Sequence, residues 1–164
     1  MSRVAGRNMA YLVVACSAGL VLWQSAAFAA DQAPALSSDE VATRIFERQQ
    51  LMQTLDDEGE VLGEIVAGLQ PPDKLALTTR AIAQAAREAA DAFRTPLPGG
   101  RSKPEVWTNH ADFMLRMDAF ARETEAMAIL GEGGNLSAVT EKLGTAMPCK
   151  QCHDLYRTPK KPGQ

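Results

Sequence analysis

The sequence has few of the side chains that most often bind transition metals: its 164 residues include three cysteines and two histidines. It also lacks any convincing run of alternating apolar and polar residues, the pattern that predicts a half-buried β-strand. Basic residues do not predominate, because 17 lysines and arginines stand against 20 aspartates and glutamates. These shortages argue against a β-sheet fold, a nucleic-acid partner and a four-ligand zinc site.

Residues 1–29 have the features of a secretory signal peptide, so they are set apart from the folded domain. Arg3 and Arg7 form a positively charged start, and an apolar run follows. Ala27-Phe28-Ala29 then supplies small residues at the −3 and −1 positions of a cleavage site. Cleavage at that point leaves a single domain of residues 30–164 and predicts export to the periplasm.

Two other interpretations of this segment stay open. One is a retained membrane anchor, although the apolar run is shorter than the ~20 residues that a spanning helix needs. The other is a lipoprotein modified at Cys16, although the apolar run continues past that residue. The segment carries two of the basic residues and no acidic one, so the rest of the chain has a net charge of −5.

The most informative segment is Cys149-Lys150-Gln151-Cys152-His153, because C-x-x-C-H is the attachment signature of c-type haem. Positions i and i+3 of a helix share a face, and i+4 lies beside them. The two thiols can therefore add to the two vinyl groups of one porphyrin while the histidine places a nitrogen on the iron. The motif predicts one haem c, bound covalently through Cys149 and Cys152, with His153 as axial ligand.

Other interpretations of the two cysteines explain less. A zinc site would need two further ligands, and His110 and His153 are the only histidines. A thioredoxin-like pair belongs to an α/β unit, for which no strands are found. A structural disulfide suits an exported chain but leaves the adjacent histidine unexplained.

Four segments of the presumed domain have helical periodicity, and short connections rich in glycine and proline separate them. They run from Ser37 to about Gly68, from Pro72 to about Thr95, from Pro104 to about Gly131, and from Asn135 into the haem motif. This pattern predicts an all-α fold, an antiparallel four-helix bundle that houses one covalently bound haem c between facing helices. Pro148 predicts a kink or a restart of the last helix at Cys149.

At this point the chain resembles the class II cytochromes c, and the cytochrome c prime family in particular. The resemblance covers essentially all of residues 30–164 and is carried by three motifs. The most specific is Cys-Lys-Gln-Cys-His-Asp-Leu-Tyr-Arg at 149–157, on the last of four helices. The others are Arg-Gln-Gln-Leu-Met-Gln-Thr-Leu at 48–55 and Lys-Pro-Glu-Val-Trp at 103–107.

The resemblance implies roles for residues on both sides of the haem. Arg157 would lie beside the proximal haem face, one turn after His153. Arg48 and Gln49 would bind the haem propionates, a task that suits a fork of donors facing carboxylates. Trp107 would pack in or near the haem pocket. From the residues alone, a solvated charge is favoured for Arg48 and an ordinary core residue for Trp107.

Met52 matches the family position that covers the distal face of the iron, so it decides the expected function. If its side chain covers the iron without bonding to it, the haem is five-coordinate and high-spin, and nitric oxide or carbon monoxide can bind reversibly. If the thioether is the sixth ligand, the protein is a low-spin electron carrier. We expect the open form, with one-electron transfer as a related capacity. His110 is a weaker candidate for the sixth ligand, because it lies on an apolar helical stripe.

The remaining expectations concern partners and activity. The resemblance implies a homodimer through the first two helices, and the redox partner is unknown. No nucleophile with an adjacent base and no pair of acids stands out, so no enzymatic activity is expected. No membrane association is expected once residues 1–29 have been removed.

Overall fold

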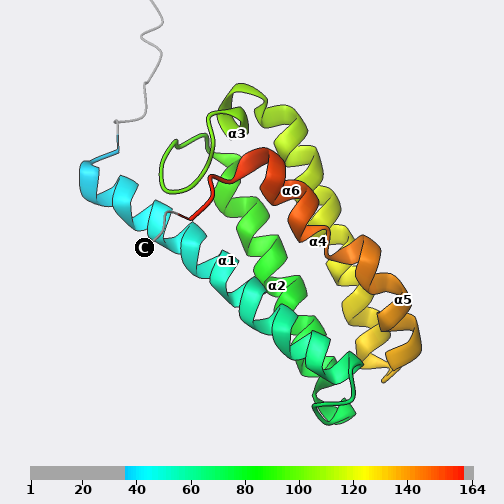
Figure 1. The fold of residues 1–164 in the computed structure, drawn as a ribbon. Coiled ribbons are helices and arrows are strands. Elements are labelled where there is room, and N and C mark those ends of the chain that lie inside the picture. The colour runs from blue at the N-terminus through cyan, green and yellow to red at the C-terminus, as the bar shows by residue number, and fades with distance from the viewer. Residues whose placement is uncertain (1–35, 161–164) are drawn as a thin grey trace, which may run out of the picture. The chain divides into compact units, whose positions relative to one another are not determined.

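The computed structural model describes residues 36–160. The presumed signal peptide and its cleavage site lie outside this range. The described part of the chain is helical, has no β-strand, and contains one isolated bridge between Ser102 and Arg157. Its elements, drawn in Figure 1, are α1 Ser38–Val66, η1 Pro72–Lys74, α2 Leu75–Arg94, α3 Glu105–Thr108, α4 His110–Glu132, α5 Leu136–Ala146 and α6 Cys149–Tyr156. The all-α prediction is confirmed, and α5 with α6 forms the fourth helix of the bundle.

The first helix begins and ends at local signals in the sequence. Ser37 caps α1 in a reciprocal capping box: the Glu40 amide donates to Ser37 Oγ at 3.3 Å, and the Ser37 amide donates to Glu40 Oε2 at 2.7 Å. The helix ends before Gly68, whose φ of 75° is a left-handed conformation that glycine adopts without steric cost. α1 continues without a break through Gly59 and Gly63, although glycine has a low helix propensity.

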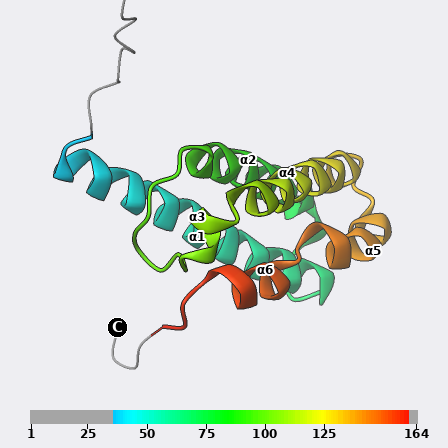
Figure 2. The same cartoon turned by 90° about the horizontal axis from the view of Figure 1, so that it is seen from above.

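The second helix lies at the centre of the hydrophobic core. Ala85, Ala86 and Ala89 are buried on α2, and their small side chains allow a close approach to α1 and α4. α2 and α4 run side by side in both views of the molecule (Figure 1 and Figure 2). At Gly131 of α4, an added Cβ would stand 2.1 Å from Thr79 Oγ1 on α2. Gly131 therefore permits this contact between the two helices.

The third predicted helix is divided, which corrects the expectation of one continuous helix from Pro104. Asn109, with φ −122° and ψ 44°, separates the four residues of α3 from α4. Asparagine has a lower helix propensity than the straight-chain residues, and the Asn109 side chain makes no capping hydrogen bond here. The break lets α3 turn away from the axis of α4 while the Phe113 amide still donates to Asn109 O at 3.1 Å.

The fourth predicted helix is also divided, at the residue that the sequence singled out. α5 ends at Ala146, and α6 restarts at Cys149 directly after Pro148. Proline has no amide hydrogen and clashes with the preceding turn, so a restart here is expected. The haem motif thus forms a separate eight-residue helix, α6. No helix between residues 36 and 160 is long and apolar enough to cross a membrane.

Candidate haem-binding site

The two cysteines of the motif are free thiols on α6, one helical turn apart. Cys149 is exposed and Cys152 is half-buried. Burial raises the pKa of the Cys152 thiol, and the nearby charge of Arg116 opposes this rise. The two cysteines lie on the same face of one short helix, at the spacing that the two vinyl groups of one porphyrin require.

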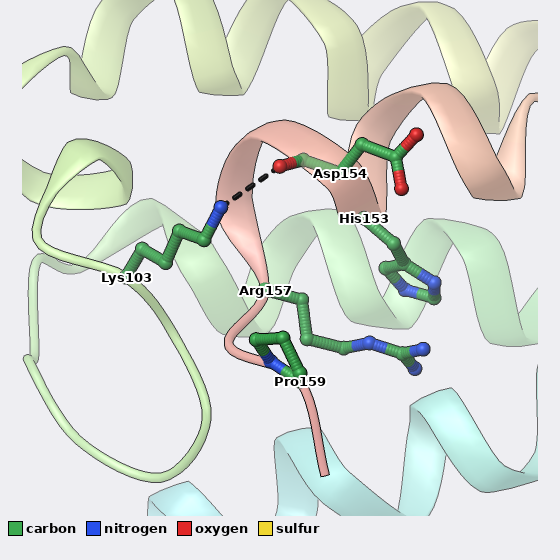
Figure 3. Close-up of a pocket in the computed structure, with 5 residues that line it drawn as sticks. All are labelled: Lys103, His153, Asp154, Arg157 and Pro159. Carbon is green, nitrogen blue, oxygen red and sulfur yellow. Dashed lines mark hydrogen bonds between the residues drawn. The ribbon is translucent and has the colours of Figure 1, made fainter.

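His153 follows directly and is half-buried. Burial lowers its pKa, and the positive charges of Arg157 and Arg101 lower it further, whereas Asp56 of α1 acts in the opposite direction. These effects favour the neutral imidazole, which is the form that binds a metal ion. Figure 3 shows the side chain of His153, on α6, and that of Arg157, directly after α6, extending side by side.

An open pocket of about 480 Å³ adjoins this face of α6. Its volume falls within the roughly 300–1,000 Å³ typical of ligand and cofactor sites. Lys103, His153, Asp154, Arg157 and Pro159 line it (Figure 3). Two of these, Lys103 and Asp154, are joined by a hydrogen bond from Lys103 Nζ to the Asp154 carbonyl at 2.8 Å. Lys103 lies inside one of the three sequence motifs, yet nothing in the sequence assigned it a place at the site.

The segment before α3 holds the C-terminal end of α6 in place. The Lys103 amide donates to Tyr156 O at 2.9 Å, and the Thr158 amide donates to Arg101 O at 2.9 Å. The Arg101 guanidinium also donates to Thr158 O. This pairing gathers three cations, Arg101, Lys103 and Arg157, around the end of α6. Sequence reasoning found only Arg157, because the other two lie about fifty residues away along the chain.

Arg48 of α1 is buried, with 5% of its surface exposed, so it is not the solvated charge that the residues alone allowed. Its guanidinium donates to three backbone carbonyls, those of Ala92, Thr95 and Leu97, at 2.7–2.9 Å. Burial lowers the pKa of the guanidinium. The proposed contact with haem propionates stays a prediction, and the nitrogens Nε, Nη1 and Nη2 each already donate one hydrogen bond within the protein.

Trp107 belongs to an aromatic group beside Arg48. Its ring stacks with Phe93 at a centroid distance of 6.2 Å and with His110 at 6.1 Å. The His110 ring nitrogen Nε2 lies 2.9 Å from the Phe93 carbonyl, so it is engaged in a backbone contact. This contact supports a structural role for His110 and disfavours it as an iron ligand.

The two remaining candidates lie on α1. Met52 is half-buried and packs against the hydrophobic core, whereas Gln49 is exposed. The structure thus brings Cys149, Cys152, His153 and Arg157 together on or beside α6. Arg48 lies against Trp107, with its Cζ atom 5.2 Å from the ring centroid, and Trp107, Met52 and Cys152 pack against the same hydrophobic core.

The donor set fits haem c better than it fits a bare metal ion. Among residues 36–160, no three His, Cys, Asp or Glu side chains gather where they could hold a metal ion together. The two thiols, spaced to meet two vinyl groups, and a neutral imidazole beside them are the groups that c-type haem attachment requires.

Comparisons with known proteins also indicate a protein that binds haem c. The family model described as Cytochrome C' matches residues 43–157. A cytochrome c' of Alcaligenes xylosoxydans xylosoxydans is 31% identical over 70 residues, which are 42% of this chain and 55% of that protein. One from Rubrivivax gelatinosus is 32% identical over 60 residues, covering 36% and 46% of the two chains. These alignments span about half the length of the curated relatives.

Solved structures share the fold over a longer stretch. A ferrous variant of cytochrome c prime from Alcaligenes xylosoxidans, with bound nitric oxide, superposes with a TM-score of 0.66 at 21% identity, covering 73% of this chain and 97% of that one. Cytochrome c prime from Shewanella frigidimarina gives a TM-score of 0.67 at 20% identity, covering 75% and 100%. Because the family model spans most of residues 36–160, the chain belongs to the cytochrome c prime family, which binds haem c covalently through cysteines, here Cys149 and Cys152.

Proposed function

We propose that this protein carries one five-coordinate, high-spin haem c and reversibly binds nitric oxide or carbon monoxide at the open position of the iron. When bound, haem iron supplies a coordination site for a diatomic gas and a one-electron couple. Cys149 and Cys152 hold the group by thioethers, and His153 is the axial ligand. The observation that carries the haem attachment is the placement of Cys149, Cys152 and His153 on one short helix, with His153 lining a pocket.

On the proximal side, the chain fixes the position of the imidazole. α6 restarts at Pro148 and is held at its other end by the pairing of Lys103 with Tyr156. Arg157 lies beside His153 and adds positive charge, which favours the unprotonated ring nitrogen needed for binding iron. Gln49, exposed on α1, supplies an amide that can donate to a propionate.

On the distal side, we assign Met52 of α1 as the side chain that covers the iron. Met52 is half-buried against the hydrophobic core, and the resemblance to the family at this position supports the open form, in which this side chain would cover the iron without bonding to it. A small neutral gas then binds by displacing an apolar side chain. Structures of the cytochrome c prime from Alcaligenes xylosoxidans have been solved with nitric oxide and with carbon monoxide bound.

The alternative function is that of an electron carrier in which the Met52 thioether is the sixth ligand. The two functions predict different results for Met52→Ala. The rate of nitric oxide binding to the ferrous protein is measured by stopped flow, and the spin state is read from the ferric spectrum. Removal of a covering side chain speeds binding and leaves the ferric spin state unchanged. Removal of a ligand converts a low-spin ferric spectrum into a high-spin one. Met52→Leu, which retains the bulk without the sulfur, is the matched control.

We also propose that residues 1–29 direct export to the periplasm and that the mature protein is a homodimer through α1 and α2. Phe46 on α1 is 58% exposed, and this apolar side chain supports a contact on that helix. Sedimentation of the holoprotein tests the dimer: Phe46→Glu should yield a monomer, and an unchanged dimer would place the interface elsewhere.

A further inference from the structure

Tyr156 lies on the same face of α6 as the second cysteine of the haem motif. It follows Cys152 by four positions, and side chains at i and i+4 of a helix are neighbours on its surface. Tyr156 belongs to the buried core, with 7% of its surface exposed, and Cys152 packs against that core. The phenol therefore lies one helical turn from a side chain that would carry a thioether to the haem.

The phenol has a proton acceptor in direct contact. Tyr156 Oη donates to Asp112 Oδ2 of α4 at 2.5 Å, and Arg116 Nε donates to the same oxygen at 2.8 Å. The hydrogen bond from Arg116, and after it that from Tyr156, lowers the pKa of the Asp112 carboxyl, so the group is ionised at neutral pH. A phenol that loses one electron becomes a much stronger acid than a carboxylic acid. Its proton would then move to the carboxylate along the existing hydrogen bond.

Aromatic rings shield this phenol from water. Phe113 of α4 packs edge-on against the Tyr156 ring, with the two centroids 5.1 Å apart. Phe93 of α2 packs edge-on against Phe113 in turn, at 5.2 Å. A radical formed on the Tyr156 ring is thereby separated from molecules in solution.

We infer that Tyr156 is an electron relay of the haem site: it gives one electron toward hydrogen peroxide held at the open position, while its proton moves to Asp112. This inference rests on the proposed five-coordinate haem, whose open position admits a small neutral molecule. It adds the reduction of a peroxide to the proposed binding of diatomic gases.

The relay conserves atoms and electrons in each step. When Tyr156 is oxidised, its O–H bond breaks, a bond from that hydrogen to Asp112 Oδ2 forms, and a phenoxyl radical remains. A one-electron donor in solution, such as ascorbate, returns the electron, and the proton goes back to the phenol oxygen. Two such rounds supply two electrons, which with two protons from water convert one hydrogen peroxide into two water molecules.

Freeze-quench EPR of the ferric holoprotein mixed with hydrogen peroxide tests the relay. Tyr156 is the one tyrosine of residues 30–164, and Trp107 is the one tryptophan, so the kind of radical identifies its residue. We expect a tyrosyl radical whose spectrum narrows when the protein is grown with ring-deuterated tyrosine. Tyr156→Phe, which retains the buried ring, should abolish this signal.

Asp112→Asn tests the transfer of the proton. The amide oxygen still accepts a hydrogen bond but does not take up the proton, so formation of the radical should slow on the order of a hundredfold. The slower formation in deuterium oxide that a coupled proton transfer produces should also be lost, whereas a merely structural contact would leave this isotope effect in place. Asp118→Asn is the matched control on α4: it removes an exposed ion pair with Arg94 and should change neither quantity.

Two results would overturn the relay. One is a radical on Trp107 in place of Tyr156, and the other is a tyrosyl radical that forms equally fast in Asp112→Asn. The ferric spectrum recorded before mixing tests the proposed open site separately. Met52→Ala opens that position even if Met52 binds the iron, so the absence of a tyrosyl radical in this variant would also contradict the inference.

Discussion

Tyr156 on α6 donates a hydrogen bond of 2.5 Å to Asp112 Oδ2 on α4. Asp112 also accepts from Arg116 Nε at 2.8 Å, so one carboxylate joins an arginine of its own helix to a tyrosine of the haem helix. Hydrogen bonds to an ionised carboxylate are short and about twice as strong as neutral ones. This contact joins the C-terminal end of α6 to α4, and the pairing of Lys103 with the Tyr156 carbonyl joins the same end to the segment before α3.

Tyr156→Phe therefore lowers Tm, because it removes the donor while leaving the buried ring in place. We expect a loss of roughly 5 °C in thermal unfolding followed by circular dichroism. Asp154→Asn is the control: its exposed ion pair with Lys150 contributes little to stability, so Tm stays nearly constant. Equal Tm values for Tyr156→Phe and the parent would show that the contact is not formed in solution.

The hydrogen bonds to the Asp112 carboxylate also predict how the thermal stability of the protein depends on pH. Hydrogen bonds from Arg116 and Tyr156 lower the pKa of its carboxyl below the usual 3.8. A carboxyl whose pKa is lower in the folded than in the unfolded state stabilises the fold above the unfolded value. It loses that contribution as the pH falls through the folded value. Asp112→Asn should thus lower Tm at neutral pH and flatten its fall below about pH 4. Parallel Tm curves for the variant and the parent over this range would contradict the assignment.

The contact between α2 and α4 at Gly131 gives a third prediction. A methyl group here would meet the Thr79 side chain, which is buried and donates to Leu75 O at 2.8 Å. Gly131→Ala should lower the free energy of unfolding by about 1–3 kcal/mol, the usual effect of overpacking a core. At Gly133 an added Cβ lies 3.6 Å from the nearest atom, so Gly133→Ala should be tolerated. Urea denaturation measures the free energy of unfolding of the two variants. Equal values would contradict the prediction, because they would show that α2 and α4 accommodate the added methyl group without loss of stability.

The features that sequence predicted correctly are local ones. The start of α1 at Ser37 was predicted because a helix cap acts within one turn of the chain, and the structure shows Ser37 as the cap. Pro148 marks the restart at α6 because proline acts on its own turn. The C-x-x-C-H motif places two thiols and an imidazole on one helical face by spacing alone.

The features that sequence missed depend on tertiary contacts. From the residues alone Arg48 looked like a solvated charge, because the helical pattern does not reveal that the end of α2 lies against it. Lys103 joins the site only because its segment pairs with Tyr156, 53 positions further along the chain. The break at Asn109 was hidden by an apolar stripe that continues through it with helical spacing.

The most direct test of the proposed function is the optical and EPR spectrum of the purified ferric holoprotein. We expect the signature of a high-spin, five-coordinate iron, with His153 as its axial ligand and Met52 covering the opposite side. Addition of nitric oxide should then give a reversible complex. A low-spin spectrum with a long-wavelength sulfur-to-iron charge-transfer band would contradict the open site, and it would identify the protein as an electron carrier ligated by Met52.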